Sequence, residues 1–349
     1  VVSEGRIVAD MPPDRLMAAG ILPPLGIREP LYVTALKYAG VEITESLHAG
    51  RLATLDVPAV RDRLLGWDAA QPEAPPAQRR APIIEAQDLS YRYVENRPIL
   101  KHLTFSMETG EMASLVGTNG AGKSTLAKVI TGICKNPDGR LFFHGQDMRD
   151  WTIHERAGKI GYVMQNPNQM ICKAMIYDEV ALGLRLRGVS EEETRPRVEK
   201  ALKTCGLSPF RKWPISALSY GQKKRVTIAS VLVLEPELMI LDEPTAGQDY
   251  RHYTEIMEFL RSLNEQGTTI LLITHDMHLM LEYAPHAIVL HNGEILLDDT
   301  AVKALTNAEI ADKASLKVTS LYELAESAGI ADCERFVRHF IDYERGTAR

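Results

Sequence analysis

The segment GTNGAGKST at residues 117–125 constrains the fold of this chain more than any other feature. It follows a short apolar run, MASLVG, and it opens AGKSTLAKVITGI, which has the pattern of a helix. A glycine-rich turn between a buried strand and a helix is the context in which the pattern G-x-x-x-x-G-K-[ST] binds phosphate. The chain is therefore predicted to contain an α/β domain with a phosphate-binding loop.

Each residue type in this loop has a physical reason to be there. Gly117, Gly120 and Gly122 let the backbone approach phosphate oxygens closely, so that N–H groups and the helix N-terminus face negative charge. Lys123 is expected to reach the β- and γ-phosphates, and Ser124 to ligate Mg²⁺. An ordinary glycine turn is the alternative, and the flanking strand and helix argue against it.

Three further apolar runs, IGYVMQ, ELMILDEP and TTILLITHD, have the length of buried strands and end in polar residues. A buried strand that ends in Asp242 and Glu243 is costly unless these charges have partners or a function. We expect Asp242 to hold Mg²⁺ through its hydration shell and Glu243 to orient the attacking water. His275 and Gln165 should reach the same edge of the sheet. Alone, each of these residues could be structural.

Composition limits the classes of function. A net charge of −6 and a pI of about 6.0 give no support to a general polyanion-binding surface. No apolar run approaches the ~18 residues that span a bilayer, and VVSEGRIVAD lacks the pattern of a signal peptide, so a cytosolic protein is expected. The cysteines form no C-x-x-C pair and are predicted to be isolated reduced thiols: Cys134, Cys172, Cys205 and Cys333.

The chain divides by composition and pattern. Residues 66–82 are rich in Pro, Ala and Gln and are predicted to be an extended linker before a domain at 83–300. Within that domain, residues 170–235 are predicted to be helical, including a helix with Ser190 and Glu193 as a capping box that Pro196 should kink or shift. Asn292-Gly293 predicts a hairpin turn, and residues 301–349 a helical extension.

Residues 1–65 repeat the end of the chain. Gly5, Ile7 and Asp10 match Gly293, Ile295 and Asp298, and Ala39-Gly40 match Ala328-Gly329, in two segments that read hairpin, helix, loop, helix. Chance similarity is the alternative. We interpret residues 1–65 as the tail of a second copy of the main domain whose body is absent from this chain, too short to form an independent domain. If ordered, they should pack as a small sheet edge or against the last fifty residues.

A second polar cluster, LSYGQKKR at residues 218–225, opens the apolar helix pattern VTIASVLVL. Ser219 at the N-cap, followed by Gly221 and Gln222, predicts a second helix N-terminus ready for phosphate. An ordinary serine cap is the alternative. Two such termini would serve one nucleotide only if they came from facing copies of the domain, which agrees with the repeat.

In their order and spacing, GTNGAGKST, Gln165, LSYGQ, LMILDEP, the following AGQD at 246–249 and His275 resemble the ABC-transporter ATPase family over residues 83–300. The resemblance implies a P-loop NTPase of the ABC type, with a mixed sheet, flanking helices, an inserted all-helical subdomain and a small C-terminal helical extension. In that family ATP lies between the phosphate loop of one domain and the LSGGQ signature of the other.

The resemblance also implies roles for individual residues. It assigns nucleotide binding, with adenine stacked on the first of them, to Tyr93, Gly117, Thr118, Asn119, Gly120, Ala121, Gly122, Lys123, Ser124 and Thr125. It assigns catalysis to Glu243, His275 and Gln165, and Mg²⁺ to Ser124, Gln165 and Asp242. It assigns contact with the partner's ATP to Ser219, Tyr220, Gly221 and Gln222.

QNPNQMICKAMIYDEVALGLRLRGVSEEE and LSYGQKKRVTIASVLVLEPELMILDEPTAG look like the ATPases of energy-coupling-factor importers, which take up vitamins, vitamin precursors or transition-metal ions. GIREPLYVTALKYAGV resembles the junction in duplicated members with two ATPase halves, of which this chain would hold the second. Tyr220 departs from the first glycine of LSGGQ, and Gln248 from the usual Leu. By the family's geometry, Tyr220 should affect only the partner's ATP.

The leading hypothesis is therefore a transport-coupled ATPase on the cytoplasmic face of the membrane, which uses ATP and Mg²⁺. Expected partners are a second ABC ATPase domain (the missing half or another copy), an integral membrane subunit and a substrate-binding membrane component. One rival is a soluble ABC ATPase that acts on nucleic acid or ribosomes, disfavoured by the short segment before the signature, the Pro-Ala-rich linker and the pI. The other is a weakly hydrolysing regulatory domain, disfavoured by intact Lys123, Asp242, Glu243 and His275.

Overall fold

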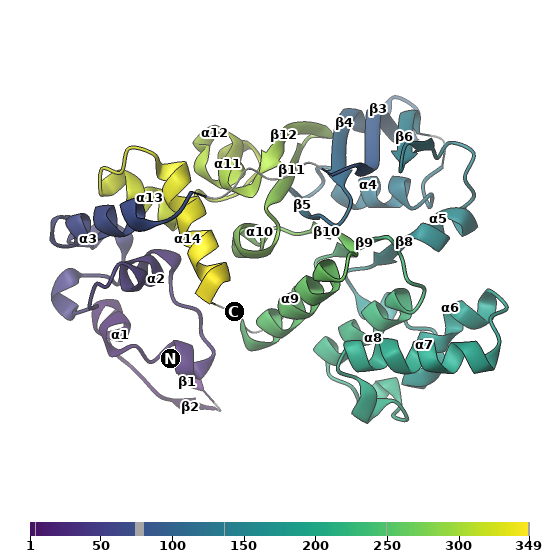
Figure 1. The fold of residues 1–349 in the computed structure, drawn as a ribbon, viewed down its shortest axis with the longest axis horizontal. Coiled ribbons are helices and arrows are strands. Elements are labelled where there is room, and N and C mark those ends of the chain that lie inside the picture. Colours follow the sequence, from purple (N-terminus) through teal and green to yellow (C-terminus); the bar gives the residue numbers. More distant parts are fainter. Residues whose placement is uncertain (4, 74–79, 136, 249, 348–349) are drawn as a thin grey trace.

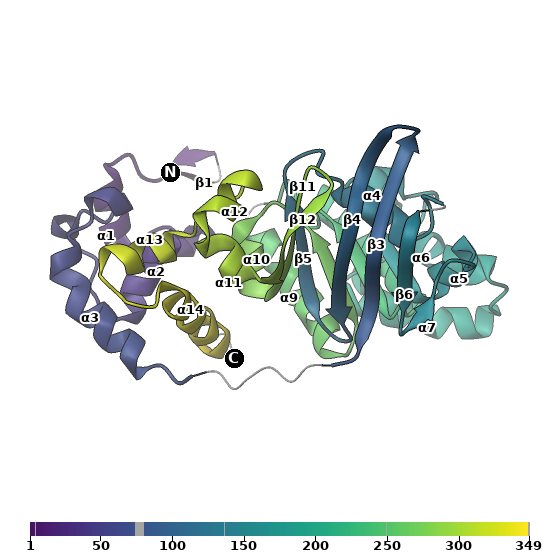
Figure 2. The ribbon, with the colours of Figure 1, turned by 90° about the horizontal axis from the view of Figure 1, so that it is seen from above.

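The structure is a computed structural model that describes residues 1–3, 5–73, 80–135, 137–248 and 250–347. Figures 1 and 2 show two parts: a sheet-containing core with a helical subdomain, and a helical unit formed by the two ends of the chain. Asp249 of the AGQD segment and residues 74–79 of the predicted linker lie outside the described residues.

A mixed sheet of six strands forms the centre of the core. In spatial order its strands are β12 (Glu294–Thr300), β11 (His286–His291), β5 (Met112–Gly117), β10 (Thr269–Ile273), β9 (Leu238–Asp242) and β8 (Ile160–Val163). Only the pair of β11 and β12 is antiparallel, and it is joined by the predicted Asn292-Gly293 turn. The parallel order brings the carboxyl ends of β5, β9 and β10 to one edge of the sheet.

Every residue of β5, β9 and β10 is buried, which explains their continuous apolar sequences. Met239 and Leu241 of β9 contact one hydrophobic core, whereas Leu238 and Ile240 contact another on the opposite face. The first core belongs to the helical subdomain and the second lies around the helix that follows the phosphate loop. The sheet is thus covered on both faces, as the predicted fold class requires.

A second, antiparallel sheet lies against the helix that follows the phosphate loop (Figure 2). Its strands, in spatial order, are β4 (Arg97–Glu108), β3 (Pro82–Val94), β6 (Asp138–Phe143) and β7 (Gln146–Asp147). The sequence did not predict this sheet, because its long strands mix buried and exposed residues irregularly. It matters to the site because β3 carries Tyr93.

The helices divide between the core and the two chain ends. Those of the core are α4 (Lys123–Ile130), α5 (Ile153–Lys159), α6 (Ile176–Leu186), α7 (Glu191–Thr204), α8 (Tyr220–Leu232), α9 (Tyr250–Glu265) and α10 (Met277–Tyr283). Those of the ends are α1 (Pro13–Ala19), α2 (Leu31–Tyr38), α3 (Val57–Ala70), α11 (Ala301–Thr306), α12 (Ala308–Lys313), α13 (Ser320–Ser327) and α14 (Cys333–Thr347). A small hairpin, β1 (Val2–Ser3) and β2 (Arg6–Ile7), precedes α1.

Helices α6, α7 and α8 pack together in one hydrophobic core within residues 170–235, the region predicted to be helical. Ser190 caps α7 by accepting a hydrogen bond from the Glu193 backbone N–H. The helix begins directly after this cap and contains Pro196, so the predicted shift of its start is wrong, and the alternative, a kink at Pro196, stays a prediction. Pro196 is the sixth helical residue, so the helix lacks the hydrogen bond that an N–H there would donate to the Glu192 carbonyl.

Residues 1–70 do not fold apart from the rest: they share one hydrophobic core with the C-terminal helices. Trp67 of α3 packs edge-on against Phe336 of α14, with ring centroids 5.6 Å apart. Asp68 is buried beside it and pairs with His339 at 2.7 Å and Arg335 at 3.0 Å. Figure 2 shows α1–α3 beside α13 and α14. The expected packing against the last fifty residues is therefore observed.

These contacts also correct the boundary predicted at residue 66. Helix α3 continues to Ala70, so residues 66–70, which composition placed in the linker, are helical. Burial of Trp67 and Asp68 against α14 holds this last turn in place. Composition missed this because Ala and Gln suit both a linker and a helix, and only the tertiary contacts distinguish the two.

The two ends of the predicted repeat have matching helix termini. Gly40 and Gly329 both have φ of 71° after α2 and α13. In each case the next residue closes the same loop: Val41 N–H donates to Leu36 O at 2.9 Å, and Ile330 N–H donates to Ala325 O at 2.9 Å. A left-handed glycine with this bond ends a helix in a Schellman motif. The two helices lie in the same hydrophobic core.

The helical unit also touches the two helices that begin beside the candidate site. Arg28, which precedes α2, forms an ion pair with Glu282. Its guanidinium lies 5.4 Å from the ring centroid of Tyr250 and 5.9 Å from that of Tyr253, both on α9. Residues 1–70 therefore contact the region that follows AGQD and the region that follows His275.

Candidate nucleotide site

The loop at residues 117–125 has the backbone geometry of a phosphate cradle. Gly117, Gly120 and Gly122 have φ of 141°, 82° and 108°, values that side chains disfavour. A Cβ at Gly122 would lie 2.7 Å from Leu100 Cδ2, and one at Gly117 would collide with the Leu290 carbonyl. Helix α4 then starts at Lys123 with no side-chain cap, so its first N–H groups are available to an anion.

Lys123 lies folded over this loop. Its Nζ donates to Gly117 O at 2.7 Å and to Thr118 O at 3.0 Å. Burial lowers the pKa of Lys123, and the nearby carboxylates of Glu243 and Asp242 oppose that shift. The ammonium therefore lies between the phosphate cradle and the carboxylates of Asp242 and Glu243, at and just after the end of β9.

Ser124 and Asp242 meet where α4 begins and β9 ends. Ser124 Oγ donates to Asp242 Oδ2 at 3.1 Å, and Tyr162 Oη donates to the same carboxylate oxygen at 3.2 Å. Burial is the largest cause that raises the pKa of Tyr162, followed by the Asp242 charge, so the phenol remains a donor. The sequence analysis did not single out Tyr162, although its position near the end of IGYVMQ was a usable signal.

Glu243 and His275 form a second contact at this edge of the sheet, which we call the acidic corner. His275 Nδ1 and Glu243 Oε1 lie 2.6 Å apart, with Glu243 buried and His275 exposed. Burial raises the pKa of Glu243, and the contact with His275 opposes that shift. Glu243 has φ of 46°, an uncommon conformation for a residue with a side chain. Such conformations cluster where a side chain must point in a fixed direction.

Tyr93 lies beside the loop but is more than half exposed, at 55%. Its hydroxyl is 3.4 Å from Thr125 Oγ1 and accepts from Cys134 Sγ at 3.4 Å. Tyr91 packs edge-on against it, with centroids 5.1 Å apart. An exposed aromatic ring anchored by its hydroxyl next to the phosphate cradle is placed to stack on a base.

The structure thus brings Lys123, Ser124, Asp242, Glu243 and His275 together, with Tyr93 at the side. Gln165 is exposed after β8, and its described contacts run through its backbone carbonyl. Within the described residues, no hydrogen bond joins residues 117–125 to residues 218–222. The signature residues are therefore on the same chain but in a separate polar cluster.

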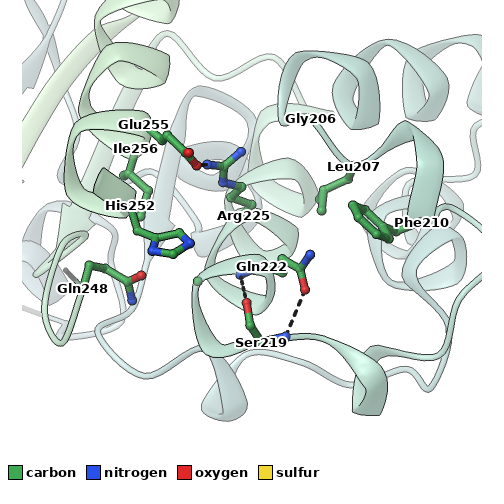
Figure 3. A pocket seen from close by; sticks show the side chains of 11 residues that line it. Gly206, Leu207, Phe210, Ser219, Gln222, Arg225, Gln248, His252, Glu255 and Ile256 are labelled. Atoms are coloured by element: carbon green, nitrogen blue, oxygen red, sulfur yellow. Dashed lines mark hydrogen bonds and ion pairs between the residues drawn. The ribbon is translucent and has the colours of Figure 1, made fainter. Parts of the chain in front are cut away.

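That second cluster is drawn in Figure 3, around a cavity of about 150 Å³. Gln222 N–H donates to Ser219 Oγ at 3.2 Å, and Ser219 N–H donates to Gln222 Oε1 at 3.0 Å, which is a complete capping box. The predicted serine cap is present, and the side chains of this segment already satisfy two of its donors; binding of phosphate at this terminus stays a prediction. The side chain of Gln248 points at Gly221, where a Cβ would lie 2.8 Å from Oε1.

Lys224, which follows the signature, is the main residue that the sequence analysis missed. It is 1% exposed, and its Nζ donates to three backbone carbonyls: Met164 O at 2.9 Å, Gln165 O at 2.9 Å and Asp242 O at 3.3 Å. Burial lowers the pKa of Lys224 to about 8. A lysine inside a helix that is otherwise apolar on its buried side was a usable signal, since buried ammonium groups need partners.

A glycine cradle at the start of α4, oxygen ligands at the end of β9 and a buried glutamate beside a histidine define a P-loop ATPase of the ABC type. Comparison with known proteins agrees with this class. Residues 100–246 match the family model of ABC transporters, and residues 19–91 match a model described as ATP-binding cassette cobalt transporter. The chain belongs to the ABC transporter ATP-binding family.

Three relatives illustrate the match. The structure of cbiO1 from Clostridium perfringens, described as part of the ABC transporter complex cbiONQ, is 34% identical with a TM-score of 0.62 and covers 72% of this chain and 100% of its own. Putative ABC transporter ATP-binding proteins of Clostridium perfringens and Enterococcus faecalis are 50% and 51% identical over 99% of this chain. The chain spans 61% of the length of each of these two relatives.

No helix formed by the described residues combines the length and apolarity needed to cross a bilayer.

Proposed function

We propose that this chain is the ATP-hydrolysing part of an energy-coupling-factor type importer, and that its Lys123 site is completed by a signature segment from a second ATPase domain. One observation carries the proposal. The phosphate cradle and the acidic corner of Glu243 and His275 are assembled within the chain, whereas the Ser219 cluster lies apart from them. A separate signature cluster agrees with a site shared between two domains.

The residues at the cradle fit MgATP. Open N–H groups and Lys123 suit the phosphates, and exposed Tyr93 suits the adenine. The hydroxyl of Ser124 and the carboxylate of Asp242 are hard oxygen ligands of the kind that Mg²⁺ prefers, and Gln165 would supply a third oxygen. When bound, the ion neutralises charge on the phosphates.

The chain's own groups then divide the work. Lys123 leaves its loop carbonyls for the phosphates. Glu243 orients and polarises the attacking water, and its short contact with His275 fixes the direction of the carboxylate. His275 is exposed enough to reach the terminal phosphate. Ser219 and Gly221 act in the same way on the nucleotide of the partner domain.

The wider organisation is also a proposal. Residues 1–70 would be the tail of a first ATPase domain, and 83–300 the second, with 301–347 as its extension. Support comes from the matching termini of α2 and α13 and from curated relatives that are longer than this chain. The match at residues 19–91 to a cobalt-transporter model, and the likeness to cbiO1, favour uptake of a transition-metal ion or a vitamin. The chain would sit on the cytoplasmic face, bound to an integral membrane subunit and a substrate-binding component.

The test is Glu243→Gln. This variant should still bind MgATP, and turnover should fall by about 10²–10⁴-fold because the positioned base is lost. ATP-bound pairs should accumulate on size exclusion, since hydrolysis reopens the shared site. Glu265→Gln, an exposed position near the end of α9, is the matched control. Near-normal turnover of Glu243→Gln would remove Glu243 from the mechanism.

A further inference from the structure

Tyr220 stands where the family's signature has a glycine, and its side chain turns back toward its own domain. Its hydroxyl donates to the Gln165 backbone carbonyl at 3.3 Å. The side chain remains 42% exposed, so it does not serve mainly to fill a core. A glycine at this position has no side chain with which to make this contact.

The same carbonyl accepts a second hydrogen bond from the start of α8. Lys224 Nζ donates to Gln165 O at 2.9 Å and also to the carbonyls of Met164 and Asp242. Both lone pairs of the Gln165 oxygen are therefore engaged by α8. Lys224, on the second turn of α8, thus ties together the segment after β8, which carries Gln165, and the end of β9, which carries Asp242.

Besides these bonds, the segment after β8 is held by the buried Pro167, by the Asn166 side chain that caps the next turn, and by Met164 N–H, which donates to Met170 Sδ at 3.1 Å. Gln165 and Asn166 are exposed, and a single 3-10 turn, η4 (Pro167–Gln169), follows. The two side-chain hydrogen bonds to the Gln165 carbonyl restrain the backbone of the exposed start of this segment directly. The position of the Gln165 side chain depends on this backbone.

We infer that Tyr220 is a positioning residue for the ATP site of its own chain. It holds the Gln165 loop and so couples that site to the α8 N-terminus, which faces the partner's ATP in the proposed function. The inference rests on the proposed function. It revises the expectation that Tyr220 affects only the partner's site.

The test uses pairs of the full chain with two different affinity tags, purified through both tags. One chain keeps an active Lys123 site, and the other carries Glu243→Gln so that its own site is nearly silent. Tyr220→Phe is placed either in the active chain or in the silent chain. In the active chain it should lower kcat by about threefold to tenfold, the effect of one hydrogen bond, with KM for ATP unchanged.

In the silent chain, Tyr220→Phe alters the signature that faces the active site, so any loss of kcat there reports the contact with the partner's ATP. Tyr177→Phe, which removes a hydroxyl from the same subdomain, is the matched control for both placements. A loss of kcat in the active-chain placement supports the inference whatever the other placement does. A loss confined to the silent-chain placement, or no loss in either, overturns it.

A second measurement separates the inference from the proposed function. If pairs with unaltered Tyr220 show no turnover, the proposed function fails, and hydrogen exchange of the single chain without nucleotide decides the inference. Tyr220→Phe should speed exchange of the Gln169 and Met170 amides, which bond within the 3-10 turn, by about threefold to tenfold. Unchanged exchange, or equal acceleration in Tyr177→Phe, overturns it.

Discussion

Helices α4 and α8 both begin at a polar, glycine-containing cluster, yet their N-termini are capped differently. The α4 terminus has no side-chain cap, and strained glycines lead into it. The α8 terminus is closed by the reciprocal Ser219–Gln222 box. Figure 1 shows the two helices on opposite sides of β8 and β9. The α4 terminus is open to an anion, whereas the α8 terminus must exchange hydrogen bonds within its capping box for hydrogen bonds to a ligand.

This difference implies an order of events. A single chain should bind ATP at α4, because the donors there lack competing partners. The α8 terminus should bind only when a partner presents a nucleotide whose charge outweighs the neutral cap.

The largest effect is expected at the open terminus. Lys123→Ala should lower turnover by about 10²–10³-fold and weaken ATP binding to the single chain. Among the described contacts, Lys123 is the only cation over the cradle, and the substitution removes it. Steady-state hydrolysis and ATP titration measure the two effects. Lys223→Ala, on the first turn of α8, is the control with the same change of charge. Equal losses in both variants would contradict the special status of α4.

A smaller effect is expected at the closed terminus. Ser219→Ala removes half of the capping box and should lower the free energy of unfolding by about 0.5–2 kcal/mol. ATP affinity of the dilute single chain should not change. Denaturant unfolding and ATP titration on the same preparation test this, with Ser216→Ala as control. Weaker ATP binding by the single variant chain would place Ser219 in its own nucleotide site.

The smallest effect on ATP hydrolysis is expected away from both termini, where a change should alter only the stability of the fold. Burial lowers the pKa of His286, but ion pairs with Asp298 at 2.6 Å and Glu111 at 2.5 Å outweigh it and raise the pKa to about 9. Since the folded pKa exceeds the unfolded value of 6.5, this stabilisation is complete below pH 6.5 and is lost as pH rises through 9.

The magnitude is on the order of 3 kcal/mol, because each pKa unit corresponds to about 1.4 kcal/mol. His286→Gln should therefore flatten the loss of stability between pH 6.5 and 9, as measured by denaturant unfolding at several pH values. His102→Gln, which alters an exposed histidine paired with Asp88, is the control. An unchanged pH profile in His286→Gln would exclude this ion-pair cluster as the cause.

Local patterns in the sequence were sufficient for much of the fold and site. The strand, glycine turn and helix around Lys123, the buried runs that end in Asp242 and His275, and the Asn292-Gly293 turn depend on neighbouring residues alone. Their predicted positions agree with the structure because local propensity and tertiary packing favour the same conformation.

What the sequence could not supply depends on contacts between distant segments. The β3–β4 hairpin has no clean alternation, and the last turn of α3 is held by α14, 267 residues away at the Asp68–Arg335 pair. The direction of Tyr220 and the carbonyl partners of Lys224 follow from how α8 meets the ends of β8 and β9. The sequence likewise did not determine whether the α8 cap is closed, because Ser219 and Gln222 can hydrogen-bond to each other or to a ligand.

The central claim is that the open terminus of one chain and the signature terminus of another form one ATP site. It is tested most directly by mixing two inactive chains. Lys123→Ala removes the cradle lysine but keeps the signature. Gly221→Asp keeps the cradle and places a negative charge where the partner's phosphate would lie; an acidic residue suits a helix start, and its Cβ displaces the Gln248 side chain.

Each variant alone should hydrolyse ATP at background rate. An equimolar mixture should recover about a quarter of the wild-type rate, because half of the pairs are mixed and each mixed pair holds one complete site. The recovered rate should rise more steeply than linearly with protein concentration. A mixture that forms pairs but stays at background, or wild-type activity from a strict monomer, would contradict the shared site.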